Sequence, residues 1–344
     1  MGTETKHSAA ILGCAGLSLT DEERQLFRDA DPLGFILFAR NVKSPEQVRA
    51  LIADLRDCVG RGGAPVLIDQ EGGRVARLRP PFWRAAPEAT RIGALYDTDP
   101  EAGCEAARLN GRLLAQDLEN LGINVDCAPV LDLQFSGAHQ IIGDRSFGAG
   151  VETVAALGRS TCEGLLAGGV VPVIKHVPGH GRAMLDSHEA LPVVDASRGE
   201  LQESDFQPFR ALSDMPIAMT AHVVYGAIDA ERPATTSAKI VREIIRGFIG
   251  FDGLLISDDL SMKALSGNLK MRTAAARDAG CDVALHCNGE IEEMTMVLEA
   301  CGPLSEEASA RMARALDLLV AIEPLGDAEA RFEELMAREP LRGG

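Results

Sequence analysis

The stretch Val170-Val171-Pro172-Val173-Ile174-Lys175-His176 joins an unbroken apolar run to two polar side chains. A strand with one solvated face alternates apolar and polar residues, whereas a strand buried on both faces of a parallel sheet is apolar throughout. This stretch therefore predicts a buried parallel strand that ends in polar groups at one edge of its sheet.

The same pattern recurs along the chain, with a helical pattern after each apolar run. The predicted strands are 9–13, 34–38, 65–69, 124–128, 171–176, 217–222, 254–258 and 283–287. The predicted helices are 21–30, 45–58, 101–121, 151–167, 201–212, 238–249 and 270–279, with a further helical stretch from 291. Helix-capping signals at Thr20 and at Ser44-Pro45 support the first two of these helices.

Eight strand–helix units predict an α/β fold of the (β/α)₈ TIM-barrel type. We expect one domain over residues 1–344, with long loops at 71–100 and 129–150 and a C-terminal helical extension from about 290. A doubly wound open sheet is the alternative, because the number of strands does not by itself require the sheet to close.

Composition and charge narrow the possible partners and the cellular compartment. The formal net charge of -17 argues against nucleic-acid or anionic-membrane partners, since phosphate binding needs a basic surface. The eight cysteines contain no C-x-x-C pair and indicate a reducing compartment. No secretory leader is recognisable and no apolar run is long enough to span a bilayer, so we expect a cytoplasmic protein. The oligomeric state is not determined by these features; a monomer is favoured.

The segment from Lys175 to His188 is dense in titratable side chains. Asp186 and His188 are two residues apart, so in an extended segment both side chains point the same way and can form an acid/base pair. His176, His180 and His188 could also suggest a metal site. However, Pro178-Gly179 interrupts their spacing and prevents a helical pair of ligands, so neither a metal nor a cofactor is predicted.

Other predicted strands also end in polar residues, which a barrel would gather at the C-terminal face of its strands. The sets are Asp69-Gln70-Glu71, His222 and Ser257-Asp258-Asp259, with Asp132 and Asp144-Arg145 in the loop after the fourth strand. Glycoside hydrolysis needs an acid/base and a carboxylate nucleophile on opposite sides of a sugar ring. Asp258 is the best nucleophile candidate. Only one of Asp258 and Asp259 should face the barrel mouth, and spacing alone does not decide which.

Taken together, these motifs resemble glycoside hydrolase family 3, and more narrowly its single-domain bacterial β-N-acetylglucosaminidases of peptidoglycan recycling. The similar segments are Asp69-Gln70-Glu71-Gly72-Gly73-Arg74-Val75-x-Arg77, Ala128-Pro129-Val130-Leu131-Asp132, Ile142-Gly143-Asp144-Arg145-Ser146-Phe147, Lys175-His176-x-Pro178-Gly179-His180-Gly181-x₄-Asp186-Ser187-His188, Met219-Thr220-Ala221-His222 and Ser257-Asp258-Asp259-Leu260-Ser261-Met262. They occur in the family's order over most of the chain.

The resemblance implies a role for each matching residue. Asp258 would be the nucleophile, and His188 would be the acid/base with Asp186 as its partner. The residues implied to bind the sugar are Asp69, Arg77, Arg145, Lys175 and His176. The implied reaction is retaining exo-hydrolysis of terminal β-linked N-acetylglucosamine from cytoplasmic muropeptides, without a cofactor. Two alternatives remain: another glycosidase or an N-acetylglucosaminide phosphorylase of this family, and a non-catalytic sugar-binding sensor.

Three further features have more than one interpretation. The cluster Arg74, Arg77, Arg79 and Arg84 is either a solvated face or a basic mouth for substrate carboxylates. His222 is predicted to be a buried wall residue, and His286 a hydrogen-bonded core histidine. The glycines around His180 suggest that residues 178–188 form a mobile loop that carries His188 over the sugar.

Overall fold

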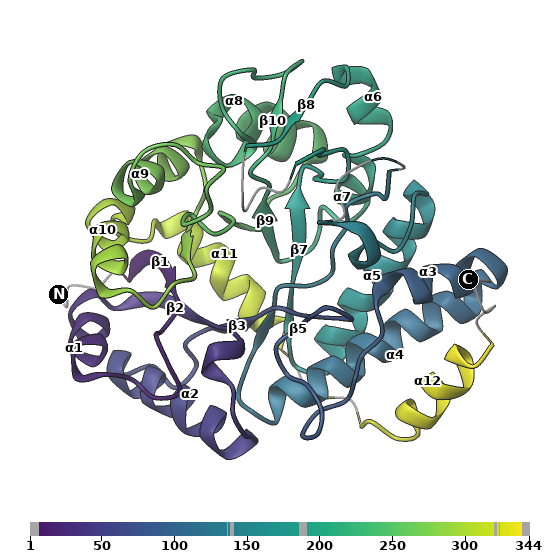
Figure 1. Ribbon diagram of the computed structural model, residues 1–344, viewed down its shortest axis with the longest axis horizontal. Coiled ribbons are helices and arrows are strands. Elements are labelled where there is room, and N and C mark those ends of the chain that lie inside the picture. The colour runs from purple at the N-terminus through teal and green to yellow at the C-terminus, as the bar shows by residue number, and fades with distance from the viewer. Residues whose placement is uncertain are drawn as a thin grey trace.

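Eight parallel strands surround a common axis in the computed structural model, which describes residues 7–135, 137, 141–185, 191–319, 322 and 324–338 (Figure 1). Neighbouring strands follow the order β12-β1-β2-β3-β6-β7-β9-β11. Their bounds are β1 (Ser8–Leu12), β2 (Pro32–Leu37), β3 (Val66–Ile68), β6 (Val125–Asp126), β7 (Val171–Val177), β9 (Ile217–Thr220), β11 (Leu254–Ile256) and β12 (Ala284–His286).

The two end strands of this order meet and close the sheet. A parallel bridge joins Ile256 to Val283, and the N–H of Ser257 donates to the carbonyl of Val283 at 3.0 Å. The N–H of Asp282 donates to the carbonyl of Leu255 at 2.7 Å. The predicted (β/α)₈ barrel is therefore confirmed, and the open doubly wound alternative is wrong.

Successive side chains of each strand point alternately to the barrel interior and to the surrounding helices, and both sides are apolar. Val173 and Ile256 belong to a cluster that fills the barrel interior, whereas Ile174 and Leu255 belong to the cluster between the strands and the surrounding helices. Both faces of every strand are thus buried, as expected for a parallel sheet covered by helices.

Helices surround the barrel (Figure 1). Their bounds are α1 (Asp21–Ala30), α2 (Pro45–Val59), α3 (Ala89–Thr98), α4 (Pro100–Glu119), α5 (Val151–Ala167), α6 (Arg198–Glu203), α7 (Gln207–Ala211), α8 (Ala238–Ile240), the π-helix η4 (Val241–Ile249), α9 (Leu269–Ala279), α10 (Ile291–Cys301), α11 (Glu306–Asp317) and α12 (Ala328–Met336). Short 3₁₀ turns are η1 (Ala39–Asn41), η2 (Gly143–Arg145) and η3 (Ala234–Thr236). The predicted capping at Thr20 and Ser44 is present: each side chain accepts the N–H of the residue three positions later.

Three predicted elements differ from the structure. The helix expected at 201–212 is divided into α6 and α7, because Pro208 lacks an N–H and begins a new helix instead of continuing the old one. The helix expected at 238–249 is wound mainly as the π-helix η4. The loop expected at 71–100 contains α3 and a hairpin of β4 (Gln70–Gly72) and β5 (Val75–Ala76). A further small pair, β8 (Val193–Val194) with β10 (Val224–Tyr225), joins two loops.

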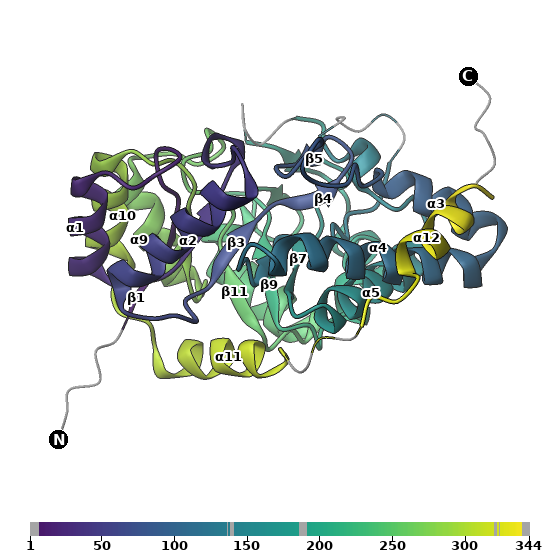
Figure 2. The ribbon, with the colours of Figure 1, turned by 90° about the horizontal axis from the view of Figure 1, so that it is seen from below.

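The segment predicted as a C-terminal extension forms three helices, which pack at three different places on the barrel. α10 packs on α9 and β1 and completes the ring of helices. α11 lies across the end of the barrel opposite β4 and β5 (Figure 2), and its Ala308, Met312 and Ala315 join the interior apolar cluster. α12 packs against α4. No helix in the described part of the chain is both long and apolar enough to cross a membrane.

Candidate active site

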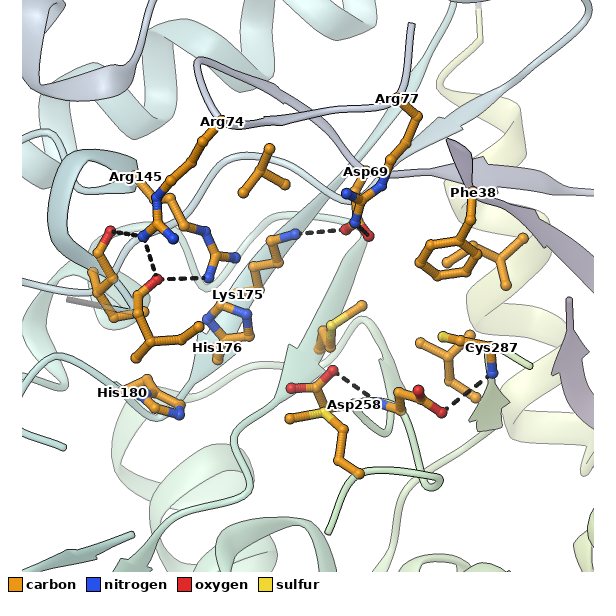
Figure 3. A pocket seen from close by; sticks show the side chains of 18 residues that line it. Phe38, Asp69, Arg74, Arg77, Arg145, Lys175, His176, His180, Asp258 and Cys287 are labelled. Atoms are coloured by element: carbon orange, nitrogen blue, oxygen red, sulfur yellow. Dashed lines mark hydrogen bonds and ion pairs between the residues drawn. The ribbon is translucent and has the colours of Figure 1, made fainter. Parts of the chain in front are cut away.

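A cavity of about 270 Å³ lies at the C-terminal ends of the strands (Figure 3). Its lining includes Asp258 and the residues predicted to bind a sugar, namely Asp69, Arg77, Arg145, Lys175 and His176. They come from the ends of β3, β7 and β11, from the residue after β5, and from η2. The barrel thus brings together residues that are up to 189 positions apart, from Asp69 to Asp258.

One wall of the cavity is a network of four charged groups around Lys175. The Lys175 ammonium donates to Asp69 at 2.8 Å and contacts Glu71 at 2.6 Å. Arg77 donates to the other oxygen of Asp69 at 2.9 Å, and Arg145 donates to both oxygens of Glu71 at 2.8 Å. Glu71 does not line the cavity, but it fixes two of the cations that do.

The charges in this network stabilise one another. Burial alone would raise the pKa of Glu71, but Arg145 and Lys175 lower it to about 2. Burial would likewise raise the pKa of Asp69, and Lys175 and Arg77 bring it well below its usual value. The pKa of Lys175 moves the other way, since Asp69 and Glu71 raise it against the effect of burial. All these groups are therefore ionised at neutral pH and present fixed charges to a ligand.

Asp132, which the sequence placed after the fourth strand without a role, anchors the second wall. Its carboxylate contacts Nδ1 of His176 at 2.7 Å and accepts the backbone N–H groups of His176 and His180 at 3.3 and 2.6 Å. The carboxylate can only accept here, so Nδ1 of His176 carries a proton and Nε2 is the ring atom left for a ligand. The pKa of His180 falls to about 4 because its ring is buried and lies beside His176.

Asp258 and Asp259 both line the cavity but differ in what their carboxylates do. The side chain of Asp259 accepts from the N–H and hydroxyl of Ser261 at 3.0 and 2.6 Å and from the N–H of Cys287 at 3.2 Å. Within the described part of the chain, the side chain of Asp258 accepts only the N–H of Asp259, at 2.8 Å. Asp259 is therefore committed to holding its own loop, and Asp258 is the carboxylate directed into the cavity (Figure 3).

The electrostatic surroundings keep Asp258 ionised. Burial raises the pKa of this carboxyl, but His222, His176, the N–H of Asp259 and Lys175 outweigh it and bring the pKa below its usual value. A carboxylate that stays charged inside a cavity is suited to nucleophilic attack on a carbon that develops positive charge.

The four clustered arginines do not form one basic mouth. Arg74 lines the cavity, but its guanidinium is ion-paired with Asp144 at 2.6 Å. Arg79 donates to the carbonyls of Ala76 and Arg74, and Arg84 donates to Asn110 and stacks over Phe332 of α12. Only Arg74 and Arg77 reach the cavity.

The remaining histidines occupy buried positions. His222 is fully buried, as predicted, and lies behind Asp258 and Asp259. His286 is also fully buried, but its ring was expected to be hydrogen-bonded, and instead its Nε2 lies 3.5 Å from the Glu293 carboxylate.

The predicted acid/base pair, Asp186 and His188, lies outside the described residues. The segment that leads towards it is firmly held: Arg182 pairs with Asp205 at 2.7 Å and stacks over Phe135, and Tyr225 donates to the carbonyl of Gly179. These contacts hold Gly179 and Arg182; the loop motion predicted for 178–188 stays a prediction, because its end lies outside the described residues. Among the described residues, no group of three His, Cys, Asp or Glu side chains could hold a metal ion.

Comparison with known proteins identifies relatives over most of the chain. Residues 8–318 match the family model of the glycosyl hydrolase family 3 N-terminal domain. A β-hexosaminidase of Alkalilimnicola ehrlichii is 42% identical over 282 residues, which cover 81% of this chain and 80% of that protein. A β-hexosaminidase of Thiobacillus denitrificans is 40% identical over 314 residues, covering 88% and 85%. The crystal structure of NagZ from Neisseria gonorrhoeae with N-trifluoroacetyl-D-glucosamine is 34% identical, with a TM-score of 0.83 and 97% of both chains covered.

Proposed function

The chain belongs to glycosyl hydrolase family 3 and is a β-hexosaminidase, and from this premise we propose that it removes single terminal β-linked N-acetylglucosamine residues from muropeptides with retention of configuration. The reaction passes through a covalent glycosyl-enzyme on Asp258. The observation that carries this proposal is the Asp258 carboxylate, ionised and directed into a sugar-sized cavity that has fixed charges along one wall.

The size of the cavity and the packed barrel interior beneath it support exo-action on one sugar. Its volume of about 270 Å³ is just below the usual range for ligand pockets, about 300–1,000 Å³. The apolar cluster that fills the barrel interior lies beneath the cavity, and α11 covers the opposite end, so a chain of sugars cannot pass through the barrel. A terminal residue can enter, and the rest of the substrate remains outside.

The charged side chains of the first wall bind the sugar hydroxyls in this proposal. Asp69 accepts hydrogen bonds, Lys175, Arg77 and Arg145 donate them, and Nε2 of His176 adds one contact from the second wall. Charged hydrogen-bonding groups whose geometry is already fixed lose little entropy on binding, so they hold the sugar with its anomeric carbon near Asp258.

His188 is proposed as the acid/base, with Asp186 as its partner. In the first step His188 would give its proton to the leaving oxygen while Asp258 attacks the anomeric carbon. In the second step it would take a proton from the water that displaces Asp258. Its position in the chain supports this role, because His180, eight residues earlier, lies in the cavity wall.

The cytoplasmic location and the muropeptide substrate are also proposals. All eight cysteines are unpaired, as expected in a reducing compartment. Muropeptides are the intracellular source of terminal β-linked N-acetylglucosamine that the resemblance to recycling enzymes suggests.

A proton NMR time course on a synthetic disaccharide muropeptide tests the proposal. The β-anomer of N-acetylglucosamine should appear first and then mutarotate, and Asp258→Asn should show no turnover while still binding N-acetylglucosamine. Release of the α-anomer first, or full activity of Asp258→Asn, would overturn the mechanism. Added phosphate should leave the product unchanged; formation of a sugar phosphate would instead make the enzyme a phosphorylase.

A further inference from the structure

Three buried side chains behind the cavity form a hydrogen-bonded chain that the mechanism above does not use. They are Thr220 at the end of β9, His222 two residues later, and Thr235 in the 3₁₀ turn η3. Each is completely buried and therefore cannot contact a substrate. We infer that Thr220, His222 and Thr235 are positioning residues that set the direction of the Asp258 carboxylate by holding the backbone of Asp258 and Asp259 at both ends.

The hydrogen bonds in this chain begin at the carbonyl of Asp259. Nε2 of His222 lies 2.9 Å from this carbonyl oxygen, and a carbonyl can only accept, so Nε2 carries a proton and donates it. Nδ1 of the same ring forms a hydrogen bond with the hydroxyl of Thr235, 2.7 Å away. The carbonyl of Ala221 is a more distant acceptor for the same hydroxyl, at 3.1 Å.

The chain continues from Thr235 to the other end of the Asp258–Asp259 pair. The hydroxyls of Thr235 and Thr220 share a hydrogen bond, with their oxygens 2.8 Å apart. The Thr220 hydroxyl accepts the N–H of Asp258, at 3.3 Å. The chain therefore connects the N–H of Asp258, through three side chains, to the carbonyl of Asp259.

This arrangement determines where the nucleophile points. Two backbone groups of the Asp258–Asp259 pair are fixed from behind, and the Asp259 carboxylate is fixed from the side by Ser261 and Cys287. The only freedom left to the Asp258 side chain is rotation about its own bonds, which the hydrogen bond from the Asp259 N–H restricts. A displacement of the nucleophile by about 1 Å can cost on the order of 10²-fold in rate.

The inference rests on the proposed function, in which Asp258 attacks the sugar. The test is the rate of covalent labelling by a 5-fluoro-N-acetylglucosaminyl fluoride, followed by intact-protein mass and by peptide mapping of the labelled residue. Thr235→Val keeps the shape of the side chain and removes its hydroxyl, whereas Thr235→Ser keeps the hydroxyl. Thr273→Val is the matched control, because Thr273 is equally buried and its hydroxyl has no hydrogen-bond partner within the described residues.

Thr235→Val should label about 10- to 100-fold more slowly at saturation, with the inhibitor concentration for half-maximal rate within about twofold of wild type. Thr235→Ser should recover most of the rate, and Thr273→Val should match wild type. A merely structural role would lower the fraction of protein that can be labelled and leave the rate constant of the folded fraction unchanged, and that result would overturn the inference. Labelling of the wild type at a residue other than Asp258 would instead refute the proposed function.

If Thr235→Val does not fold, two histidine variants provide the same test. The amide of His222→Gln reaches the position of Nε2 and can still donate to Asp259, whereas the amide of His222→Asn reaches only the position of Nδ1. His222→Gln should therefore label faster than His222→Asn. Equal rates, or the reverse order, would contradict the inference.

Discussion

Replacing Glu71 by glutamine should destabilise the protein by an amount that depends on pH. The Glu71 carboxylate is 7% exposed, accepts two bonds from Arg145 and contacts Lys175, and these partners hold its pKa at about 2 instead of the usual 4.5. At about 1.4 kcal/mol for each pKa unit, this difference corresponds to about 3 kcal/mol of folding stability at neutral pH. Glutamine has nearly the same shape but no charge, so the variant should lack this contribution.

The pH dependence follows from the sign of the shift. A carboxyl whose pKa is lower in the folded state stabilises the fold above its unfolded-state pKa, and this contribution disappears as the pH falls through its folded-state pKa. The difference between wild type and Glu71→Gln should be nearly complete at pH 7, decrease below about pH 4.5 and fall to about half near pH 3. Urea unfolding followed by circular dichroism at each pH measures it.

A surface pair with nearly the same geometry provides the control. Glu105 accepts two bonds from Arg331, at 2.8 and 2.7 Å, but these side chains are 41% and 34% exposed. Solvent screens such a pair, so Glu105→Gln should have a much smaller effect. If the two variants lost equal stability, or if the loss in Glu71→Gln did not depend on pH, the argument from the buried charge network would be refuted.

The remaining predictions concern the cavity directly. Asp132→Asn should lower kcat/KM for an aryl N-acetylglucosaminide by about 10-fold or more, because the His176 ring loses its charged partner; an unchanged value would remove Asp132 from the site. Asp259→Asn should reduce the melting temperature but still be labelled at Asp258, as peptide mapping would reveal. Gly181→Ala should lower kcat, because a Cβ there would lie 2.0 Å from the carbonyl oxygen of Leu133 and displace the segment leading to His188. The rate of labelling at Asp258 in the wild type should not fall between pH 7 and pH 5, since the lowered pKa keeps this carboxyl ionised.

The strands could be predicted from the sequence because burial on both faces leaves a strong local pattern. Each of the eight predicted strands overlaps an observed one, as at β7 and β12. The sequence did not predict helix α3. This helix contains Gly93, and a Cβ added there would collide with the backbone carbonyl of Phe147. Packing of that kind comes from distant residues, and helix propensity along the chain does not reveal it.

The site was predictable where a side chain lines the cavity and less so where it acts through another residue. Asp69, Lys175 and Asp258 each lie within the last two residues of a predicted strand, and the barrel brings them together. Glu71 could have been noticed from its spacing of two residues from Asp69 in a strand-like segment. Thr220 and Thr235 gave no such signal, because their contact depends on the turn η3 folding back against the end of β9.

The position of α11 has a consequence for the order in which products leave. Because this helix and the apolar cluster that it joins fill one end of the barrel, the way out of the cavity, among the described residues, leads towards the C-terminal ends of the strands, and in the proposed reaction the released sugar lies deeper than the fragment to which it was attached. In the proposed mechanism the outer fragment departs first, and the water that completes the reaction enters through the space it leaves. N-acetylglucosamine departs last in this mechanism, so it should inhibit competitively against the substrate, whereas the outer fragment should bind productively only while the sugar is still held.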